Sequence, residues 1–409
     1  MLFISNYYPP YHKGGYEELC ADVAEGLTNR GHSISVITSS IGPHTQDSLR
    51  IPIHRILHLE VSGKPILVNF NILINKKKKI LHNNSAIDRI INEFNPDAIM
   101  VWGMWNLPRA ILSELEKFEN YPVVYYIADY WPSLPDAYTL HWQSPSRIRH
   151  FKLIKKIIAW MVVGEGNRQL NRPNLLFNNV MCVSNSVKEK LTRDVGLPET
   201  TTVIYNGIDI TNFSFNKATF FVDDLDKPLR MLYAGRITYE KGVVIALQAL
   251  SELNHLGINV YLDIIGNGSK RYIKELHNLC KDEDISEKVK FHDGVSRDMM
   301  PSILSDYDIL LVPSLVPDAL PRIIQEGMAV GCVVVASDIG GIPEIIEDGV
   351  NGLLFSPGDH NDLESKILLM YKNPTYFEQY SSEGRKTVEE RFTIKKMVDK
   401  IETYLHQIA

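Results

Sequence analysis

Four charged residues in the second half of the 409-residue chain have the types and spacing of a site for a phosphorylated ligand. Arg236 and Lys241 flank a turn where an apolar strand pattern gives way to a helix pattern. Two such cations suit a diphosphate, because Arg matches planar oxygens and Lys adds a point charge. Asp318 and Glu326 lie in the loop before a later helix and on that helix. Glu326 suits the vicinal diol of a ribose and Asp318 a second polyol, so together the side chains predict a nucleotide-sugar site.

The elements that must position these residues alternate between strands and helices. Buried-strand patterns in the first half cover 2–5, 33–40, 97–102, 123–128 and 179–184. The pattern restarts with expected strands at 229–235, 259–266, 288–294, 308–314 and 333–338, and with expected helices at 242–255, at 269–281 and from Pro321. Alternation of this kind predicts parallel sheets covered by helices on both faces.

Two such runs predict an α/β chain of two doubly wound, Rossmann-like domains that face each other across a cleft. The weakest pattern lies at 206–228, so we expect an N-terminal domain over 1–205 and a C-terminal domain over 206–391. The last helix, over 392–409, is expected to pack back onto the first domain. Ligands of open α/β sheets bind at the carboxyl ends of the strands, which is where the conspicuous loops fall.

Composition excludes several other classes of protein. Apolar residues make up 44% and charged residues 22% of the chain, and no apolar run approaches the ~18 residues of a membrane span. The chain opens with a strand pattern, so no signal peptide is expected. The four cysteines are far apart in apolar contexts, and the thirteen histidines show no metal-binding motif. These features predict a cytoplasmic protein with reduced thiols, no metal and no nucleic-acid partner.

Charge is distributed unevenly about the net value of −6. Residues 1–205 hold 22 Lys and Arg against 18 Asp and Glu, and the surplus gathers at Lys76–Lys79 and at 147–164. In the second segment apolar residues recur at helical spacing between cations. One interpretation is a solvated face over a core helix. The other is a basic amphipathic helix that attaches the chain peripherally to an anionic membrane on its inner face.

The sequence resembles the family-four retaining glycosyltransferases of the GT-B fold over essentially its whole length. The opening "YYPPYHKGGYEELCADVAEGLTNRGHSISVIT", the crossover "VIYNGID" and "YAGRITYEKG" match the ordered motifs of that family. The segment "PSLVPDALPRIIQEGMAVG" carries its pair of acids separated by seven residues. The resemblance implies transfer of a sugar from a UDP- or GDP-type nucleotide sugar to a hydroxyl of a sugar or lipid-linked acceptor, in cell-surface polysaccharide or glycolipid assembly. It implies no cofactor beyond this co-substrate.

The resemblance also implies a role for each matching residue. Arg236 and Lys241 would stabilise the leaving diphosphate, Glu326 would bind the ribose, and Asp318 would contact the donor sugar. Asp129 would join Arg236, Lys241 and Asp318 as a catalytic residue. Further donor contacts would come from loops near the diphosphate, the base and the sugar, at Gly14, Gly15, Gly266, Gly294, Val295, Ala319, Leu320, Pro321, Arg322 and Ile323.

The sequence departs from the family pattern in three places, and rival interpretations stay open. Asp318 stands where the family has Glu, Ala319-Leu320-Pro321 replaces a glycine-rich turn, and Ala128 replaces a His. Ala128 and the shorter Asp318 favour, as one alternative, a non-catalytic nucleotide-sugar-binding partner. A sugar-nucleotide epimerase on the same fold is the other alternative, and the spacing of Arg236 with Lys241 and of Asp318 with Glu326 argues against it. Glu326 is also placed to pair with Arg322 one helical turn away, and Gly14-Gly15 could form a dinucleotide-binding turn.

Overall fold

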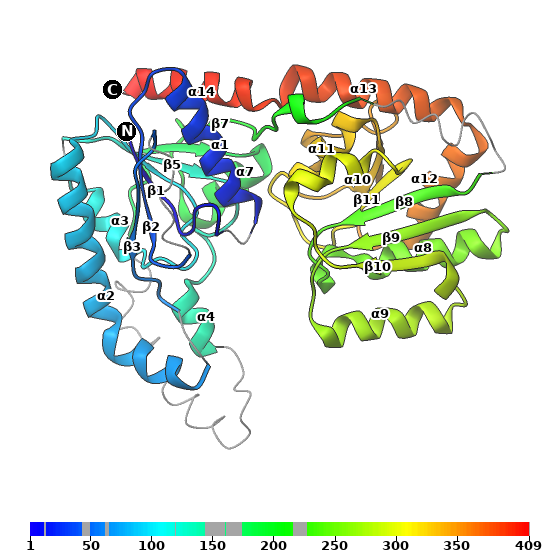
Figure 1. The fold of residues 1–409 in the computed structure, drawn as a ribbon, viewed down its shortest axis with the longest axis horizontal. Helices are drawn as coiled ribbons and strands as arrows, with labels where there is room; N and C mark the ends of the chain where they lie inside the picture. The colour runs from blue at the N-terminus through cyan, green and yellow to red at the C-terminus, as the bar shows by residue number, and fades with distance from the viewer. Residues whose placement is uncertain are drawn as a thin grey trace. The chain divides into compact units, whose positions relative to one another are not determined.

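The structure is a computed structural model that describes residues 1–11, 14–42, 50–61, 65–118, 120–143, 160, 174–215 and 227–408. The chain divides into two compact units. The first unit comprises Met1–Val183, Val187–Ile204 and Val398–Ala409, and the second comprises Ser184–Ser186 and Tyr205–Met397. Each unit is built on a sheet of its own (Figure 1).

The first unit contains a seven-stranded parallel sheet in the order β3-β2-β1-β4-β5-β6-β7. Its strands are β1 (Leu2–Ile4), β2 (Ser35–Ser39), β3 (Ile53–Leu57), β4 (Ile99–Val101), β5 (Val123–Ile127), β6 (Asn179–Cys182) and β7 (Thr202–Val203). Its helices include α1 (Gly15–Asn29), α2 (Pro65–Phe94), α3 (Ala110–Leu115), α4 (Ala137–Gln143) and most of α7 (Asn185–Val195). Strands β1, β2, β4 and β5 are buried at every residue, as expected of a parallel sheet covered on both faces.

The second unit contains a six-stranded parallel sheet in the order β10-β9-β8-β11-β12-β13. The strands are β8 (Leu229–Ala234), β9 (Val260–Ile265), β10 (Val289–His292), β11 (Ile309–Val312), β12 (Val333–Ser337) and β13 (Leu353–Phe355). The helices are α8 (Val243–His255), α9 (Lys270–Asp282), α10 (Met300–Leu304), α11 (Arg322–Val330), α12 (His360–Lys372), α13 (Thr375–Arg391) and the start of α14 (Ile394–Ile408).

Both sheets reverse their strand order once, at a point that locates the site. In the first unit the reversal lies between β1 and β4, and in the second it lies between β8 and β11. A crevice opens at the carboxyl ends of the strands where the order reverses, and this is where such folds bind ligands. The predicted architecture of two doubly wound parallel sheets is therefore confirmed. The loops after β8 and β11 hold Arg236, Lys241 and Asp318.

Several elements differ from the sequence prediction. The helix expected from Pro321 begins at Arg322, because Pro321 has extended backbone and precedes the first helical turn. No clear hydrophobic periodicity in the sequence indicates the 30-residue helix α2 or the short strands β3, β7 and β13. The basic segment 147–164 lies outside the described residues, except for the exposed Trp160.

The lysine cluster Lys76–Lys79 is only partly a solvated basic face. Lys79 Nζ donates to the carbonyl oxygens of Leu59 and Glu60, at 2.7 and 3.1 Å. Lys76 Nζ lies 3.8 Å from the buried Glu60 carboxylate and 3.7 Å from that of Asp136. Two of the four lysines therefore support the interior of the first unit, which leaves Lys77 and Lys78 exposed.

Two further sequence expectations concern membranes and thiols. Within the described residues, every helix is too short or too polar to span a bilayer. All four cysteines are buried as free thiols, which confirms that they form no disulfide. Burial raises the pKa of Cys280 to about 11, so this thiol is protonated at neutral pH.

Candidate functional site

The loops that follow β8 and β11 in the second unit are interlocked. Gly242, at the start of α8, has φ +68°, and a Cβ added there would lie 1.8 Å from the carbonyl oxygen of Pro313. Leu315 N–H also donates to the carbonyl oxygen of Glu240 at 2.8 Å. Glycine is required at residue 242 both for its backbone conformation and for this close approach. The interlock fixes the loop that carries Arg236 and Lys241 against the loop that carries Asp318.

Lys241 and Asp318 meet at this junction. Lys241 Nζ lies 2.5 Å from Asp318 Oδ1, with the two side chains 23% and 18% exposed. Ser314 Oγ donates to the other carboxylate oxygen, Oδ2, at 2.5 Å. Arg236 is exposed at the same loop, and its carbonyl oxygen accepts from the hydroxyl of Tyr233 at 2.6 Å. The structure therefore brings three of the predicted residues to one edge of the sheet, two of them in direct contact.

Glu326 is buried on the first half of α11, with only 6% of the residue exposed. Its Oε1 lies 3.7 Å from Nε of Arg297, which precedes α10. Helical spacing indicates Arg322 as a partner of Glu326, and it carries no signal for Arg297, which belongs to another loop. Glu326 therefore lies on the helix that follows the Asp318 loop, with a guanidinium from a different loop beside it.

Two buried polar residues that sequence reasoning missed support the loop between Asp318 and α11. Asn206 Nδ2 donates to the carbonyl oxygen of Leu320 at 3.0 Å, and Gln325 Nε2 donates to Asn206 Oδ1 at 2.6 Å. Asn206 is 4% exposed and Gln325 is fully buried. The available signals were Asn206 in the motif "VIYNGID" and a glutamine inside an apolar helix, but neither shows that the two residues meet.

The sugar-side segment Ala319–Ile323 enters α11 at its N-terminus. Gly341 N–H donates to the carbonyl oxygen of Asp318 at 2.8 Å, and a Cβ at Gly341 would lie 2.0 Å from the carbonyl oxygen of Ala319. The turn is thus packed directly on backbone. The first amides of a helix have no partner within the helix, so Arg322 and Ile323 contribute N–H groups suited to an anion. Pro321 contributes none.

The loops after β9 and β10 lie beside the loop after β8. Gly266 has φ +155°, and a Cβ there would lie 1.8 Å from the carbonyl oxygen of Gly235. Gly294 N–H donates to the Asn267 side chain at 3.3 Å, and Val295 next to it is 37% exposed. The residues predicted near the base therefore lie in one cluster of loops with Arg236. Asn267 lies at the centre of this cluster and was not among the predicted residues.

The first unit holds the remaining predicted residues. Gly14 precedes α1, and its N–H donates to Glu17 Oε2 at 3.1 Å, which fixes the glycine turn at Gly14-Gly15. The hydroxyl of Tyr16 donates to the carbonyl oxygen of Tyr126 and accepts from Ala128 N–H. Tyr16 therefore links the glycine turn to the end of β5, where Asp129 follows.

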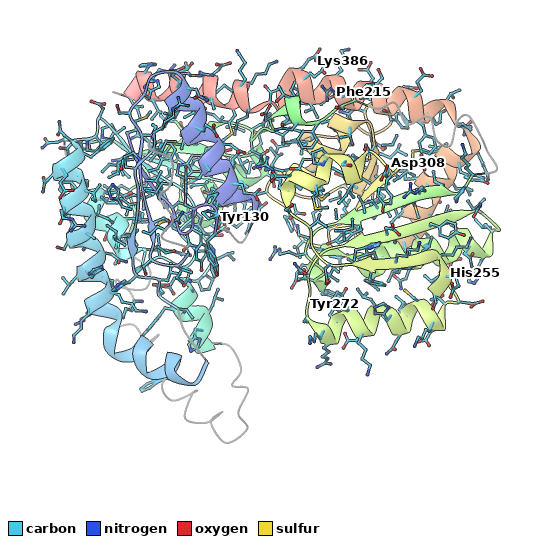
Figure 2. The ribbon with its side chains drawn as sticks, in the orientation of Figure 1. Tyr130, Phe215, His255, Tyr272, Asp308 and Lys386 are labelled. Atoms are coloured by element: carbon cyan, nitrogen blue, oxygen red, sulfur yellow. The ribbon has the colours of Figure 1, made fainter. Side chains whose placement is uncertain are left out.

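Asp129 is half-buried and is held by its own loop. Its Oδ1 accepts from Trp131 N–H at 3.0 Å, and Tyr130 between them is labelled in Figure 2. Burial raises the pKa of Asp129 to about 6, against the opposing effects of the Trp131 N–H and of Arg109. Trp131 itself belongs to the core and is 2% exposed. Asp129 can therefore exchange a proton near neutral pH.

Comparisons with protein families cover both units. Residues 13–212 match the family described as Glycosyltransferase Family 4, and residues 216–387 match the family described as Glycosyl transferases group 1. A curated relative is the amylovoran biosynthesis glycosyltransferase AmsK of Erwinia amylovora, 34% identical over 151 residues, which are 36% of this chain and 37% of AmsK. The matched stretches span 37–57% of the lengths of the first four curated relatives.

Solved structures share the fold over the whole chain. A sucrose-phosphate synthase from Thermosynechococcus elongatus superposes with a TM-score of 0.75 at 17% identity, over 100% of this chain and 98% of the other. Anabaena HepE, solved in complex with UDP, superposes with a TM-score of 0.69 at 21% identity, over 99% of each chain. These likenesses establish the GT-B fold.

Proposed function

Since the chain belongs to the family-four-like glycosyltransferases with the GT-B fold, we propose that it transfers a sugar from a nucleoside-diphosphate sugar to a hydroxyl acceptor, with retention at the anomeric carbon. The observation that carries the proposal is the gathering of Arg236, Lys241, Asp318 and Glu326 around the loops after β8 and β11. Cations, a helix N-terminus and two carboxylates together suit a diphosphate joined to two polyols.

In the proposed reaction, Arg236 and Lys241 stabilise the charge that develops on the leaving diphosphate. Groups that are already positioned where charge develops supply the largest part of such catalysis. Glu326 accepts hydrogen bonds from the ribose hydroxyls, and Asp318 accepts from the donor sugar. The departing phosphate deprotonates the acceptor hydroxyl on the same face of the sugar, so no covalent enzyme intermediate and no cofactor are required.

The first unit supplies the acceptor side in this proposal. Gly14 and Gly15 form the glycine turn at the start of α1, and Asp129 lies after β5, with Tyr16 linking the two. A UDP-type donor is supported by the fold shared with HepE. A polysaccharide or glycolipid acceptor is supported by the biosynthetic role in the name of AmsK.

The reaction is tested by incubating the purified protein with UDP- and GDP-sugars, ranked first by thermal shift, and by measuring free nucleoside diphosphate. We expect one donor to release the diphosphate in the presence of an acceptor extract, and Asp318→Asn to lower that release at least tenfold. The anomeric configuration of the product, read by NMR, tests retention.

The two rival functions give different results in the same experiment. A non-catalytic binding partner would shift its melting temperature with a nucleotide sugar but release no diphosphate. An epimerase would return a different sugar or sugar nucleotide without an acceptor. Either result would overturn the proposal of glycosyl transfer.

Attachment to an anionic membrane is a second part of the proposal and rests on the basic amphipathic pattern of 147–164. Each Lys or Arg near an anionic surface adds about 1 kcal/mol. Co-sedimentation with anionic but not neutral vesicles, lost at high salt, is the expected result. Failure to bind anionic vesicles at low salt would leave the segment as a core helix and point to a soluble acceptor.

A further inference from the structure

Three side chains that commonly bind metals lie together in the first unit, outside the candidate site. They are His32, which follows α1, and Glu402 and His406, which lie on α14. One ligand atom from each residue lies within 4.8 Å of the other two. His32 and Glu402 are half-buried and His406 is exposed, so the group is open to solvent.

The end of α1 fixes the backbone of His32. Gly31 has φ +93°, its N–H donates to the carbonyl oxygen of Thr28 at 3.0 Å, and His32 N–H donates to that of Leu27 at 3.2 Å. This pattern of bonds is the Schellman ending of a helix. From this fixed backbone, His32 Nε2 lies 2.6 Å from Glu402 Oε1.

Arg30 orients the carboxylate of Glu402. Its NH1 donates to Glu402 Oε2 at 2.7 Å, and its NH2 donates to Asp399 Oδ1 at 2.6 Å. Oε1 is thereby directed at His32, and carboxylates that bind a metal ion are usually held by hydrogen bonds in this way.

His406 completes the set because it lies one helical turn after Glu402. Residues at positions i and i+4 share a helix face. Two imidazoles and one carboxylate are the donors that Zn²⁺ takes, at about 2.0–2.2 Å, often with water in the fourth position. The ring of His406 is exposed, so it can rotate to bring its nitrogen closer to the ligand atoms of His32 and Glu402.

We propose that His32, Glu402 and His406 bind a divalent transition-metal ion of the Zn²⁺ class. The bound ion joins the end of α1 to the C-terminal half of α14, both within the first unit. Its role is structural, because His32 lies at the opposite end of α1 from the glycine turn at Gly14-Gly15. The sequence pattern hides the site, because the two ligating segments are 370 residues apart.

The experiment uses full-length protein without a histidine tag, freed of metal with EDTA and titrated with Co²⁺, which gives a visible band when bound in a tetrahedral site. We expect His406→Ala and Glu402→Gln each to weaken Co²⁺ binding by roughly 10- to 100-fold or more, the range seen when even supporting residues of a metal site are lost. The matched control is His255→Ala at the end of α8, labelled in Figure 2 and 61% exposed beside Glu252.

The result that would overturn the proposal is equally specific. His406 is exposed, so its removal leaves the fold intact, which circular dichroism checks. The proposal is wrong if the His406→Ala protein binds Co²⁺ as tightly as the native protein. It is also wrong if the native protein gives no Co²⁺ band at Co²⁺ concentrations about 100-fold above the Kd of a typical Zn²⁺ site. In either case the three residues form no metal site. The His32–Glu402 contact is then an ion pair only.

Discussion

Lys241 and Asp318 form an ion pair of 2.5 Å across the two interlocked loops of the second unit. Both residues have separate roles in the proposed reaction, Lys241 toward the diphosphate and Asp318 toward the sugar. With Ser314 on the other carboxylate oxygen, Asp318 has both oxygens occupied. Each carboxylate oxygen can accept a second hydrogen bond and the ammonium has three donors, so in the proposed reaction both side chains can bind the donor while they hold each other in place.

Arg236→Ala and Lys241→Ala are each expected to lower turnover by roughly 10²–10³, because each removes charge stabilisation of the leaving group. Release of nucleoside diphosphate under saturating donor measures the effect. The matched control is Lys290→Ala, an exposed lysine on β10, which should leave turnover unchanged. Turnover at the native level in the Arg236 variant would exclude the diphosphate clamp.

Asp318→Asn should separate binding from chemistry. The amide keeps the size of the side chain and can still accept from Ser314, so the loop stays in place, while the charge that faces the sugar and Lys241 is lost. We expect nucleoside diphosphate to bind within about threefold of the native affinity, which is less than 1 kcal/mol, while sugar transfer falls at least tenfold. Equal transfer rates would assign Asp318 a supporting role only.

Glu326→Ala is expected to weaken nucleoside diphosphate binding by about 1–3 kcal/mol, because charged hydrogen bonds to the ribose are lost. Calorimetry with the plain nucleoside diphosphate measures this, and Glu287→Ala, on an exposed turn, is the control. Unchanged affinity would show that Glu326 serves only as the structural partner of Arg297.

Gly242→Ala tests the interlock of the loops by itself. The added Cβ meets the carbonyl oxygen of Pro313 at 1.8 Å, so we expect the variant to lose about 2–4 kcal/mol of unfolding free energy. Gly257→Ala is the matched control, since Gly257 also has positive φ but no atom within 4 Å of an added Cβ. Strain at Gly257 alone should cost about 1 kcal/mol. Equal losses in urea unfolding would mean that the contact with Pro313 contributes nothing.

Asp129→Asn should change how stability depends on pH. The folded-state pKa of Asp129 is raised to about 6 from 3.8, so the folded chain holds this proton more tightly than the unfolded chain. The native protein therefore loses stability at this group as pH rises from about 4 to 6, by on the order of 1–3 kcal/mol. The Asp129→Asn protein should lack this loss of stability. The control variant Asp282→Asn, at an exposed residue at the end of α9, should show the same loss as the native protein. Parallel curves for native protein and Asp129→Asn would contradict the assignment.

The sequence predicted the architecture and the loops because both depend on local patterns. Continuous apolar runs such as β5 and β12, each buried at every residue, mark the strands of a covered parallel sheet. The loop residues Arg236, Lys241 and Asp318 could then be placed together, since the carboxyl ends of neighbouring strands share one edge. Asp308, labelled in Figure 2, precedes β11 and so lies at the opposite edge, where its carboxylate accepts from Arg230 N–H.

Side-chain pairs between distant segments could not be predicted in this way. Asn206 meets Gln325 across 119 residues, and Arg297 meets Glu326 from another loop. The sequence suggested the nearer Arg322 as the partner of Glu326, because helical spacing was the only geometry available. Lys76 similarly looked like part of a surface patch, although its ammonium faces the buried Glu60 and Asp136.

The first unit is built from segments on both sides of the second unit in the sequence, and this has a consequence for synthesis on the ribosome. Residues up to Ile204 emerge early, but the piece from Val398 that completes the unit emerges only after the second unit. At about 5–20 residues per second, the nascent unit waits on the order of 10–40 seconds for it. During that time the surface of α1 at Gly26, where Val398 finally packs, has no cover. The second unit therefore has all of its segments before the first unit can close over α1.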